Sequence, residues 1–385
     1  MTGFASALAI DAEWQNCVAA VADAVRHVDG ANLGFVYIGD PLSAHADSIV
    51  NQLRMRTGVV DWVGSVGLGV SATGTMEFDT PALSVMVGAF PDDSYRVFGS
   101  TELDPATRSW ARDRGARFGV IHGDPHVTHL PDDIVRFVAD LDGGFLVGGL
   151  SSSRSACPQI ANGAVRGGLS GALFAPEVGV ATRLSQGCSP IGEVHTVTRG
   201  DGNLIAELNG RPALEVMKES IGELLAKDLR RAAGYIFVAF TVPGSDTTEY
   251  MVRNLVAVDT RSGIIAVGEH VKVGDTIVFC RRDAASAVED MERMLDRLCE
   301  ILGARQPQAG LYFSCLARGP NQFSPQDLEL QMIRDRLGDF PLAGFFANGE
   351  ISHDRLYGYT GVLTLFTGDQ AGLVKPSVSK CIAQA

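Results

Sequence analysis

Two charged residues beside glycine offer the clearest candidate chemistry in this sequence. Arg318 directly precedes Gly319, and Glu350 directly follows Gly349. Each stands next to an apolar run typical of a β-strand, where glycine lets a ligand approach the backbone closely. A guanidinium can bind a carboxylate, and a carboxylate can bind an ammonium group. The two residues therefore predict either a ligand site or a buried ion pair between them.

Further candidate ligand contacts lie in glycine-flanked runs. GSVGLG begins at Gly64, GGLSSS at Gly148 and FFANGEI at Phe345. A small-molecule site needs a mostly apolar lining with a few convergent polar groups. We therefore predict a pocket where these runs converge, and its expected contact residues are Arg318, Gly319, Phe345, Phe346, Glu350, Gly67, Ser151 and Cys188.

Cys188 is a candidate nucleophile because the neighbouring Gly187 and Pro190 favour a turn that could present its thiol. A reactive thiol needs a base, and folding could bring His195 to it. An ordinary structural cysteine is the alternative. The sequence has no HExxH, GxSxG, Walker A or complete GxGxxG motif. We therefore expect no enzyme, and a cysteine-dependent enzyme is kept as an alternative.

Three histidines, His122, His126 and His129, follow one predicted strand. Their spacing would suit a metal on a helix, but Pro125 and Pro131 indicate a loop, so solvated or capping roles compete with metal or haem ligation. A haem would need an axial ligand that faces an apolar pocket. The candidates for that ligand are His122, His195, His270, His353 and Cys188.

The elements that must position these residues repeat three times. Each copy has an apolar strand, a helix, a second apolar strand, a polar loop and a third apolar strand. We call them modules one, two and three, and they span Gly34–Phe90, Gly119–Ala175 and Gly310–Phe366. Glycines at 58 and 338 are expected to end two of the module helices with positive φ. Ser324 is expected as the N-cap of the module-three helix, with Asp327 closing a capping box.

Other helices are expected over 11–30, around 104–117, from Pro212 onward with Leu224 on its apolar face, and after Asp283. Short β segments are expected over 176–210, and four strands are expected between residues 234 and 282. The sequence thus predicts a two-domain α+β protein of mixed α/β layers built from the repeated modules. The expected division is an N-terminal helix over 1–30, a domain with modules one and two over 31–210, a domain with module three over 211–366, and a tail over 367–385.

Composition limits the class of protein. The formal net charge of -13 argues against non-specific nucleic-acid binding and against anionic membrane surfaces. No apolar run approaches the length of a membrane span, and the N-terminus lacks the pattern of a signal peptide. Seven scattered cysteines without a CxxC pair are typical of a reducing compartment. We therefore expect a cytoplasmic protein.

Several runs, in order, resemble one known family. GLYFSCLARG, PLAGFFANGEI and LYGYTGVLTLF resemble the C-terminal half of the FIST domain (F-box and intracellular signal transduction). VGGLSSS, RGGLSGALF, QGCSPIGEVHTVT and IAELNGRPALEVM resemble its N-terminal half. The resemblance extends from about residue 30 to about residue 366.

This resemblance implies a sensory domain for small ligands, for which amino acids have been suggested. A stand-alone member would act in signal transduction through a separate partner, such as a histidine kinase. One branch of the family implies an alternative, a haem protein that senses nitric oxide and regulates a histidine kinase. The resemblance does not point to a haem ligand at any one position of this sequence.

Overall fold

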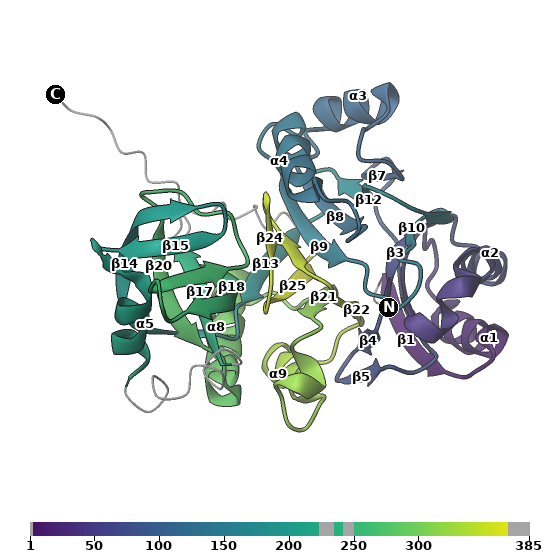
Figure 1. Cartoon of the computed structure of the whole chain (residues 1–385). Coiled ribbons are helices and arrows are strands. Elements are labelled where there is room, and N and C mark those ends of the chain that lie inside the picture. Colours follow the sequence, from purple (N-terminus) through teal and green to yellow (C-terminus); the bar gives the residue numbers. More distant parts are fainter. Residues whose placement is uncertain (1–2, 223–234, 242–249, 369–385) are drawn as a thin grey trace. The chain divides into compact units, whose positions relative to one another are not determined.

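The strand–helix–strand repeat predicted from the sequence is present three times in the computed structural model, which describes residues 3–222, 235–241 and 250–368 (Figure 1). Module one contains β2 (Leu33–Gly39), α2 (Ala46–Thr57), β3 (Asp61–Gly67) and β6 (Ala82–Gly88). Module two contains β8 (Phe118–Gly123), α4 (Leu130–Asp140), β9 (Phe145–Leu150) and β12 (Leu169–Phe174). Module three contains β21 (Ala309–Cys315), α9 (Leu328–Leu337), β22 (Leu342–Ala347) and β25 (Gly361–Phe366).

A strand and a helix precede every module, so the structural repeat is longer than the sequence indicated. The three pairs are β1 (Phe4–Ile10) with α1 (Trp14–Val25), β7 (Tyr95–Phe98) with α3 (Pro105–Arg114), and β13 (Val180–Ser185) with α8 (Ala284–Leu302). The helices expected near 104–117 and after Asp283 are confirmed, whereas β1 was not expected. In the third pair, residues 186–283 are inserted between the strand and the helix.

Each module also contributes a short hairpin to the sheet of another module. The hairpins are β4 (Gly69–Ala72) with β5 (Thr75–Phe78), β10 (Gln159–Ala161) with β11 (Ala164–Val165), and β23 (Glu350–Ser352) with β24 (Arg355–Tyr357). The resulting sheets have the orders β1-β6-β2-β3-β10-β11, β24-β23-β9-β8-β12-β7 and β13-β25-β21-β22-β4-β5. Module one thus extends the sheet of module three, module three that of module two, and module two that of module one. The three strands predicted in each module do share one sheet, whereas the hairpins lie where the sequence indicated polar loops and were not predicted.

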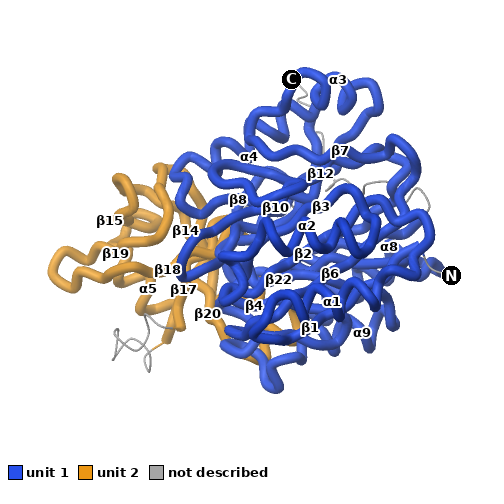
Figure 2. The backbone as a smooth tube through the Cα atoms, turned by 90° about the vertical axis from the view of Figure 1, so that its right-hand side faces the viewer, with its two compact units in different colours: residues 1–185, 291–373 blue, residues 186–290, 374–385 orange. Residues whose placement is uncertain are grey.

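This cyclic exchange joins the three modules in one compact unit. Unit 1 comprises residues 1–185 and 291–373, and unit 2 comprises residues 186–290 and 374–385 (Figure 2). Module three therefore packs with modules one and two, and does not lie in the second domain where the sequence placed it. The sequence could not show this because the strands that join the modules are short and pair with partners far away along the chain.

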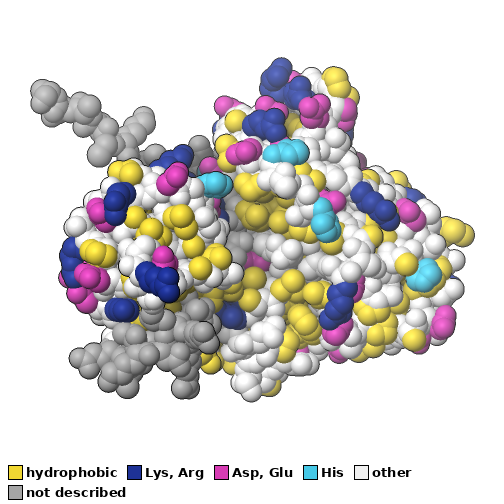
Figure 3. All heavy atoms as spheres, in the orientation of Figure 1, with side chains coloured by type: hydrophobic (Ala, Val, Ile, Leu, Met, Phe, Trp, Pro, Cys, Tyr) yellow, Lys and Arg dark blue, Asp and Glu magenta, His cyan; other side chains and the backbone are white. Residues whose placement is uncertain are grey.

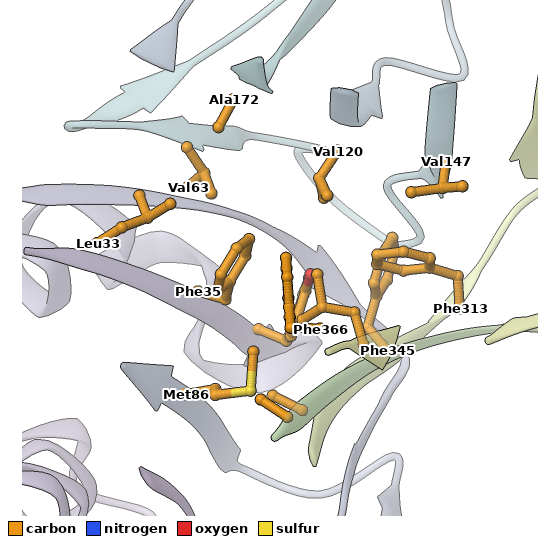
Figure 4. Packing of buried hydrophobic residues seen from close by; sticks show 14 of the residues in the cluster. Leu33, Phe35, Val63, Met86, Val120, Val147, Ala172, Phe313, Phe345 and Phe366 are labelled. Carbon is orange, nitrogen blue, oxygen red and sulfur yellow. The ribbon is translucent and has the colours of Figure 1, made fainter. Parts of the chain in front are cut away.

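The inner faces of the three sheets pack together around one hydrophobic core. Figure 4 shows Phe35 and Met86 from module one, Val120 from module two, and Phe313 and Phe345 from module three turned toward a common centre. Helices cover the outer faces: α1 and α2 pack on the first sheet, α3 and α4 on the second, and α8 and α9 on the third. Pairs of helices thus enclose three sheets, with approximate threefold symmetry.

One glycine in each module sets how closely its two parallel strands approach. A Cβ added to Gly64, Gly148 or Gly344 would lie 1.8, 1.7 or 1.9 Å from a carbonyl oxygen of the neighbouring strand. These residues pair with Val36, Ile121 and Tyr312, so they occupy the same place in each module. The glycines that interrupt the apolar runs are therefore a packing requirement of the repeat.

Unit 2 contains a closed antiparallel barrel. Its strands are β14 (Ser189–Asp201), β15 (Leu204–Leu208), β16 (Arg211–Pro212), β17 (Ile236–Thr241), β18 (Tyr250–Asp259), β19 (Ile264–Val267) and β20 (Thr276–Arg281). The order runs β14-β20-β17-β18-β19-β15, and β14 also pairs with β15, which closes the ring. Helix α5 (Ala213–Ile221) packs on this barrel through Leu214 and Met217. The four strands expected between residues 234 and 282 are confirmed.

Several local expectations can be compared with the structure. Gly58 and Gly338 follow α2 and α9 with φ of 76° and 92°, as predicted. The predicted cap at Ser324 is wrong, because α9 starts after Asp327, whose carboxylate accepts a hydrogen bond from Met76 N. Two 3-10 helices, Asp40–His45 and Gly319–Asn321, follow β2 and β21. Leu224 and residues 369–385 lie outside the described part of the chain.

The charges on the surface and the hydrophobicity of the helices can be compared with the expectation of no nucleic-acid or membrane partner. On the face shown in Figure 3, Lys and Arg side chains are scattered among Asp and Glu, without a concentrated basic area. Within the described ranges, no helix combines the length and apolar character needed to cross a lipid bilayer.

Candidate functional site

Three rings meet where the central strands of the three sheets come together. Tyr37 on β2, His122 on β8 and Phe313 on β21 have centroid separations of 5.7 Å (Tyr37–His122), 6.2 Å (His122–Phe313) and 6.1 Å (Tyr37–Phe313). These distances form a nearly equilateral triangle, as the threefold arrangement requires. Phe345 on β22 lies against all three rings, at 5.1 Å from Tyr37 and 5.9 Å from each of the others.

At the level of this triangle, each sheet presents a row of four paired residues. The first sheet presents Ser84, Tyr37, Ser65 and Gln159. The second presents Ser170, His122, Gly149 and Glu350. The third presents Val362, Phe313, Phe345 and Val70. The third row is apolar, whereas the first two are mostly polar. We call the seven side chains Tyr37, Ser65, Ser84, Gln159, His122, Ser170 and Glu350 the polar layer.

Several polar atoms of this layer are buried without a hydrogen-bond partner among the described residues. They are Tyr37 Oη, both ring nitrogens of His122, Ser170 Oγ, Gln159 Oε1 and Glu350 Oε1. Tyr37, His122 and Glu350 are each 0% exposed. Buried polar groups in folded proteins are almost always hydrogen-bonded, to protein or to ordered water, so this cluster makes the layer a candidate site.

The remaining polar atoms of the layer hold its side chains in place. Ser65 Oγ and Ser151 Oγ are 2.8 Å apart, and Gln159 Nε2 donates to Ser151 Oγ at 3.2 Å. Ser84 Oγ donates to the carbonyl of Ser71 at 2.7 Å. The layer is thus partly fixed by internal hydrogen bonds and partly unsatisfied.

Burial determines the protonation states in the layer. It lowers the pKa of His122 to about 3, so the imidazole is neutral at physiological pH. It raises the pKa of Tyr37 well above its usual value. It also raises the pKa of Glu350 to about 8, although hydrogen bonds from Thr360 work in the opposite direction. At neutral pH the layer therefore carries almost no charge and offers both donors and acceptors.

Glu350 is the one residue of the layer that can become an anion near neutral pH. Its Oε2 accepts hydrogen bonds from Thr360 N at 3.1 Å and Thr360 Oγ1 at 2.7 Å. The Cys315 thiol also faces this carboxyl, and its own pKa is raised to about 12, mainly by burial. Glu350 is the first residue of β23, not the last residue of the preceding strand as predicted.

Arg318 does not pair with Glu350. Its Nε donates to Glu329 Oε1 at 2.8 Å, and both side chains are buried. Glu329 also accepts hydrogen bonds from Tyr312 Oη at 2.7 Å and from the backbone N of Gly319 at 3.1 Å. A buried ion pair is therefore present, as one alternative from the sequence proposed, but its acid is on α9. The sequence did contain a signal for this pairing. Glu329 stands four residues before Ile333, so both lie on the buried face of α9.

Of the other predicted contact residues, Gly67, Ser151 and Phe345 lie at or beside the polar layer, whereas Gly319 and Phe346 lie on the outer face of the third sheet, which α8 and α9 cover. A Cβ on Gly67 would lie 3.1 Å from the Phe345 side chain, and one on Gly319 would lie 2.6 Å from Phe346. Ser151 hydrogen-bonds within the layer. Cys188 belongs to unit 2, where its thiol hydrogen-bonds to Cys280 and, together with burial, raises the pKa of Cys280. Tyr37, Ser84 and Ser170 were not predicted, although each interrupts an otherwise apolar run.

The candidate haem ligands do not fit a haem in this structure. His195 Nε2 lies 3.3 Å from Ser220 Oγ, and its Nδ1 lies 3.2 Å from Asn209 Nδ2, so both ring nitrogens already have partners. His353 pairs with Asp354, and His270 is exposed. His122 has free nitrogens, but a porphyrin on it would have to displace at least one of the rings packed around it.

The other histidines of the cluster are solvated. His126 pairs with Asp124 and His129 lies 3.4 Å from Asp133, with side chains 71% and 66% exposed. Over the described ranges, no group of three or more His, Cys, Asp or Glu side chains is arranged to hold a metal ion.

Comparison with known proteins agrees with the resemblance noted in the sequence. The model of the FIST N domain matches residues 32–211, and that of the FIST C domain matches residues 213–353. The boundary between these matches lies close to the expected one at residue 210, whereas unit 2 in the structure spans it.

Similar curated proteins come from mycobacteria. An uncharacterized protein of Mycobacterium tuberculosis is 33% identical over 351 residues, which cover 84% of this chain and 88% of that protein. An uncharacterized protein of Mycobacterium bovis is 37% identical over 195 residues, which cover 48% of this chain and 50% of the relative. With both domain models matched over most of its length, the chain belongs to the FIST family.

Proposed function

We propose that this chain is a small-ligand-binding sensory protein whose ligand binds at the polar layer of unit 1. FIST domains are associated with sensory signal transduction, and this supports the general role. The site is proposed from the unsatisfied donors and acceptors of the layer. In this proposal the protein is not an enzyme, and it passes its signal to a separate partner.

The observation that carries the proposal is the contrast between His122 and Phe313. The two residues occupy equivalent places in the second and third sheets. The fold therefore accepts a phenyl ring at this place, and it does not need an imidazole there. An unpaired buried polar group costs about 1–3 kcal/mol, so keeping His122 and Tyr37 in the core lowers stability. A ligand that hydrogen-bonds to them would offset this cost.

The family supports a signalling protein as the partner, and the cysteines support the cytoplasm as the compartment. The resemblance to stand-alone FIST proteins suggests a histidine kinase or another signalling protein as the partner. Seven scattered cysteines without a CxxC pair are typical of a reducing compartment, and this supports the cytoplasm as the location. We therefore propose a cytoplasmic sensor.

A thermal-shift screen tests this function. The purified chain, His122→Phe and the surface control His27→Gln would be unfolded in the presence of a panel of amino acids, amines, alcohols and nucleobases. A ligand of the layer should raise the Tm of wild type and His27→Gln and have a much smaller effect on His122→Phe. If every compound leaves the wild-type Tm unchanged, or shifts all three proteins equally, the proposed site is wrong.

A further inference from the structure

The polar layer contains one acid, Glu350, and no Lys or Arg, and this favours one chemical class of ligand. We propose that the ligand is a small amine without a carboxylate, and that its ammonium group binds Glu350 Oε1. This inference rests on the proposed function, because it concerns the same layer. It differs from the amino acid that the family resemblance suggests.

Glu350 is held in a position to receive a cation. Its Oε2 is fixed by two hydrogen bonds from Thr360, which leave Oε1 as the unpaired oxygen. On the neighbouring strand, Glu350 pairs with Gly149, which pairs in turn with His122. A Cβ on Gly149 would lie 2.6 Å from Ala347 Cβ and 3.4 Å from the Phe345 ring, so both of these side chains pack against the backbone between Glu350 and His122. Glu350 and His122 therefore flank the end of one aromatic ring.

No positive side chain of the described part is available in the layer to bind a carboxylate. The seven side chains of the layer include no Lys or Arg. Arg318 is the cation whose charge acts on Glu350, and its Nε is committed to the buried carboxylate of Glu329. A bound carboxylate would thus lose its hydration without gaining an opposite charge, which is costly in a buried site. Burying the carboxylate of an amino acid would therefore weaken its binding, whereas a simple amine has no carboxylate to bury.

The aromatic rings also favour a cation. Tyr37, Phe313 and Phe345 lie within 6.1 Å of one another, measured between ring centroids. The faces of such rings attract ammonium groups, and the attraction is stronger where water is excluded. The Cys315 thiol and Thr360 face Glu350, and neither carries a positive charge that would repel an ammonium group. Arg318 lies farther along the same segment, and the carboxylate of Glu329 neutralises its charge.

Proton release should accompany binding of an amine. The neutral carboxylic acid of Glu350 loses its proton to solvent, and the resulting carboxylate pairs with the ammonium group, which stays protonated. The overall change is the release of one proton per ligand at pH values where Glu350 is protonated in the free protein. Because burial raises the pKa of Glu350 to about 8, release should be largest near pH 6 to 7 and small above about pH 9.

Calorimetric titration of the whole chain tests the inference. The probes are matched sets of an amine, an alcohol and an amino acid on ethyl, butyl and benzyl skeletons. At least one amine should bind more tightly than its alcohol and amino-acid counterparts. Its heat of binding should vary with the ionisation enthalpy of the buffer at pH 6.5, in the direction of proton release.

Two variants complete the test. Glu350→Gln keeps the shape of the side chain and should weaken binding of the amine by about tenfold or more, because a charge-assisted contact is lost. Glu102→Gln, which removes an exposed carboxylate of the same unit, should bind like wild type. If an alcohol or an amino acid binds as tightly as the amine, or Glu350→Gln binds equally well, the amine inference is wrong. Binding of such a compound that still requires His122 would leave the proposed function standing, whereas the absence of any binding would contradict both.

Discussion

The imidazole of His122 and the phenol of Tyr37 lie with their ring centroids 5.7 Å apart at the centre of three sheets. Neither ring has a hydrogen-bond partner for its polar atoms among the described residues. In the third sheet, Phe313 fills the equivalent place and contacts both rings. Two strands of the repeat thus carry polar rings where the third carries a purely apolar one. In the proposed function, a ligand supplies the hydrogen-bond partners that these two polar rings lack.

The first prediction concerns the stability of the layer. Tyr37→Phe removes a buried hydroxyl without a partner and keeps the ring, so the ligand-free variant should be more stable by about 1 kcal/mol. Chemical denaturation of ligand-free protein measures this. The same variant should show a smaller ligand-induced rise in Tm than wild type. A destabilised variant would show that the hydroxyl has a partner within the fold.

The second prediction is a pH dependence that originates at Glu350. The folded state holds the Glu350 proton up to a pKa of about 8, whereas the unfolded chain releases it near the ordinary pKa of a glutamate, 4.5. The contribution of this group to stability is therefore fully present below about pH 4.5 and is lost as pH rises toward 8. Denaturation of wild type and Glu350→Gln should give a difference in unfolding free energy that falls across this range. A difference that is constant from pH 5 to 8 would show that the carboxyl is already ionised.

The third prediction separates Arg318 from Glu350. Arg318→Gln leaves Glu329 buried without its cation and should lower the unfolding free energy by about 3–5 kcal/mol. Glu350→Gln should be at least as stable as wild type at pH 7, because the carboxyl of unfolded wild type is ionised there whereas that of the folded protein is mostly neutral, and Gln cannot ionise in either state. Urea denaturation of both variants is sufficient. If Arg318→Gln and Glu350→Gln lost the same amount of unfolding free energy, an ion pair between Arg318 and Glu350 would be indicated.

The fourth prediction compares two glycines of different roles. Gly58 has φ of 76° and open space where a Cβ would be, so Gly58→Ala should cost only about 1 kcal/mol of backbone strain. Gly344→Ala would place its Cβ 1.9 Å from the Tyr312 carbonyl oxygen and should cost more than about 3 kcal/mol. The measured losses should therefore be ordered Gly344→Ala well above Gly58→Ala. The reverse order would contradict the strand spacing described for module three.

The repeat could be predicted from the sequence because it depends on local patterns. Apolar runs and helical spacing recur in each module, and the glycines at 58 and 338 mark the ends of the helices in modules one and three. The exchange of hairpins could not be predicted, because β10 and β23 are each three residues long and pair with strands far away along the chain. The insertion of unit 2 between β13 and α8 was hidden for a similar reason: the third copy is interrupted by a complete barrel.

The candidate site was predictable only in part. Phe345, Glu350 and Ser151 were found because they belong to runs that contain glycine and follow predicted strands. The ion-pair partner of Arg318 was missed because module three offers two acids, Glu329 and Glu350. Only the direction of the Arg318 side chain after β21 determines that it pairs with Glu329. Tyr37 and His122 were not linked, because their proximity depends on the packing of three sheets and not on any spacing along the chain.

The most direct test of the central claim is the ¹⁵N NMR spectrum of the histidine side chains, with His122 assigned by its loss in His122→Phe. The proposal predicts a neutral imidazole signal that does not titrate between pH 5 and 8, since burial lowers the pKa of His122 to about 3. It further predicts that this signal shifts when a compound that raises the Tm is added, while the signal of exposed His27 does not. An unmoved His122 signal in protein saturated with that compound would contradict binding at the polar layer.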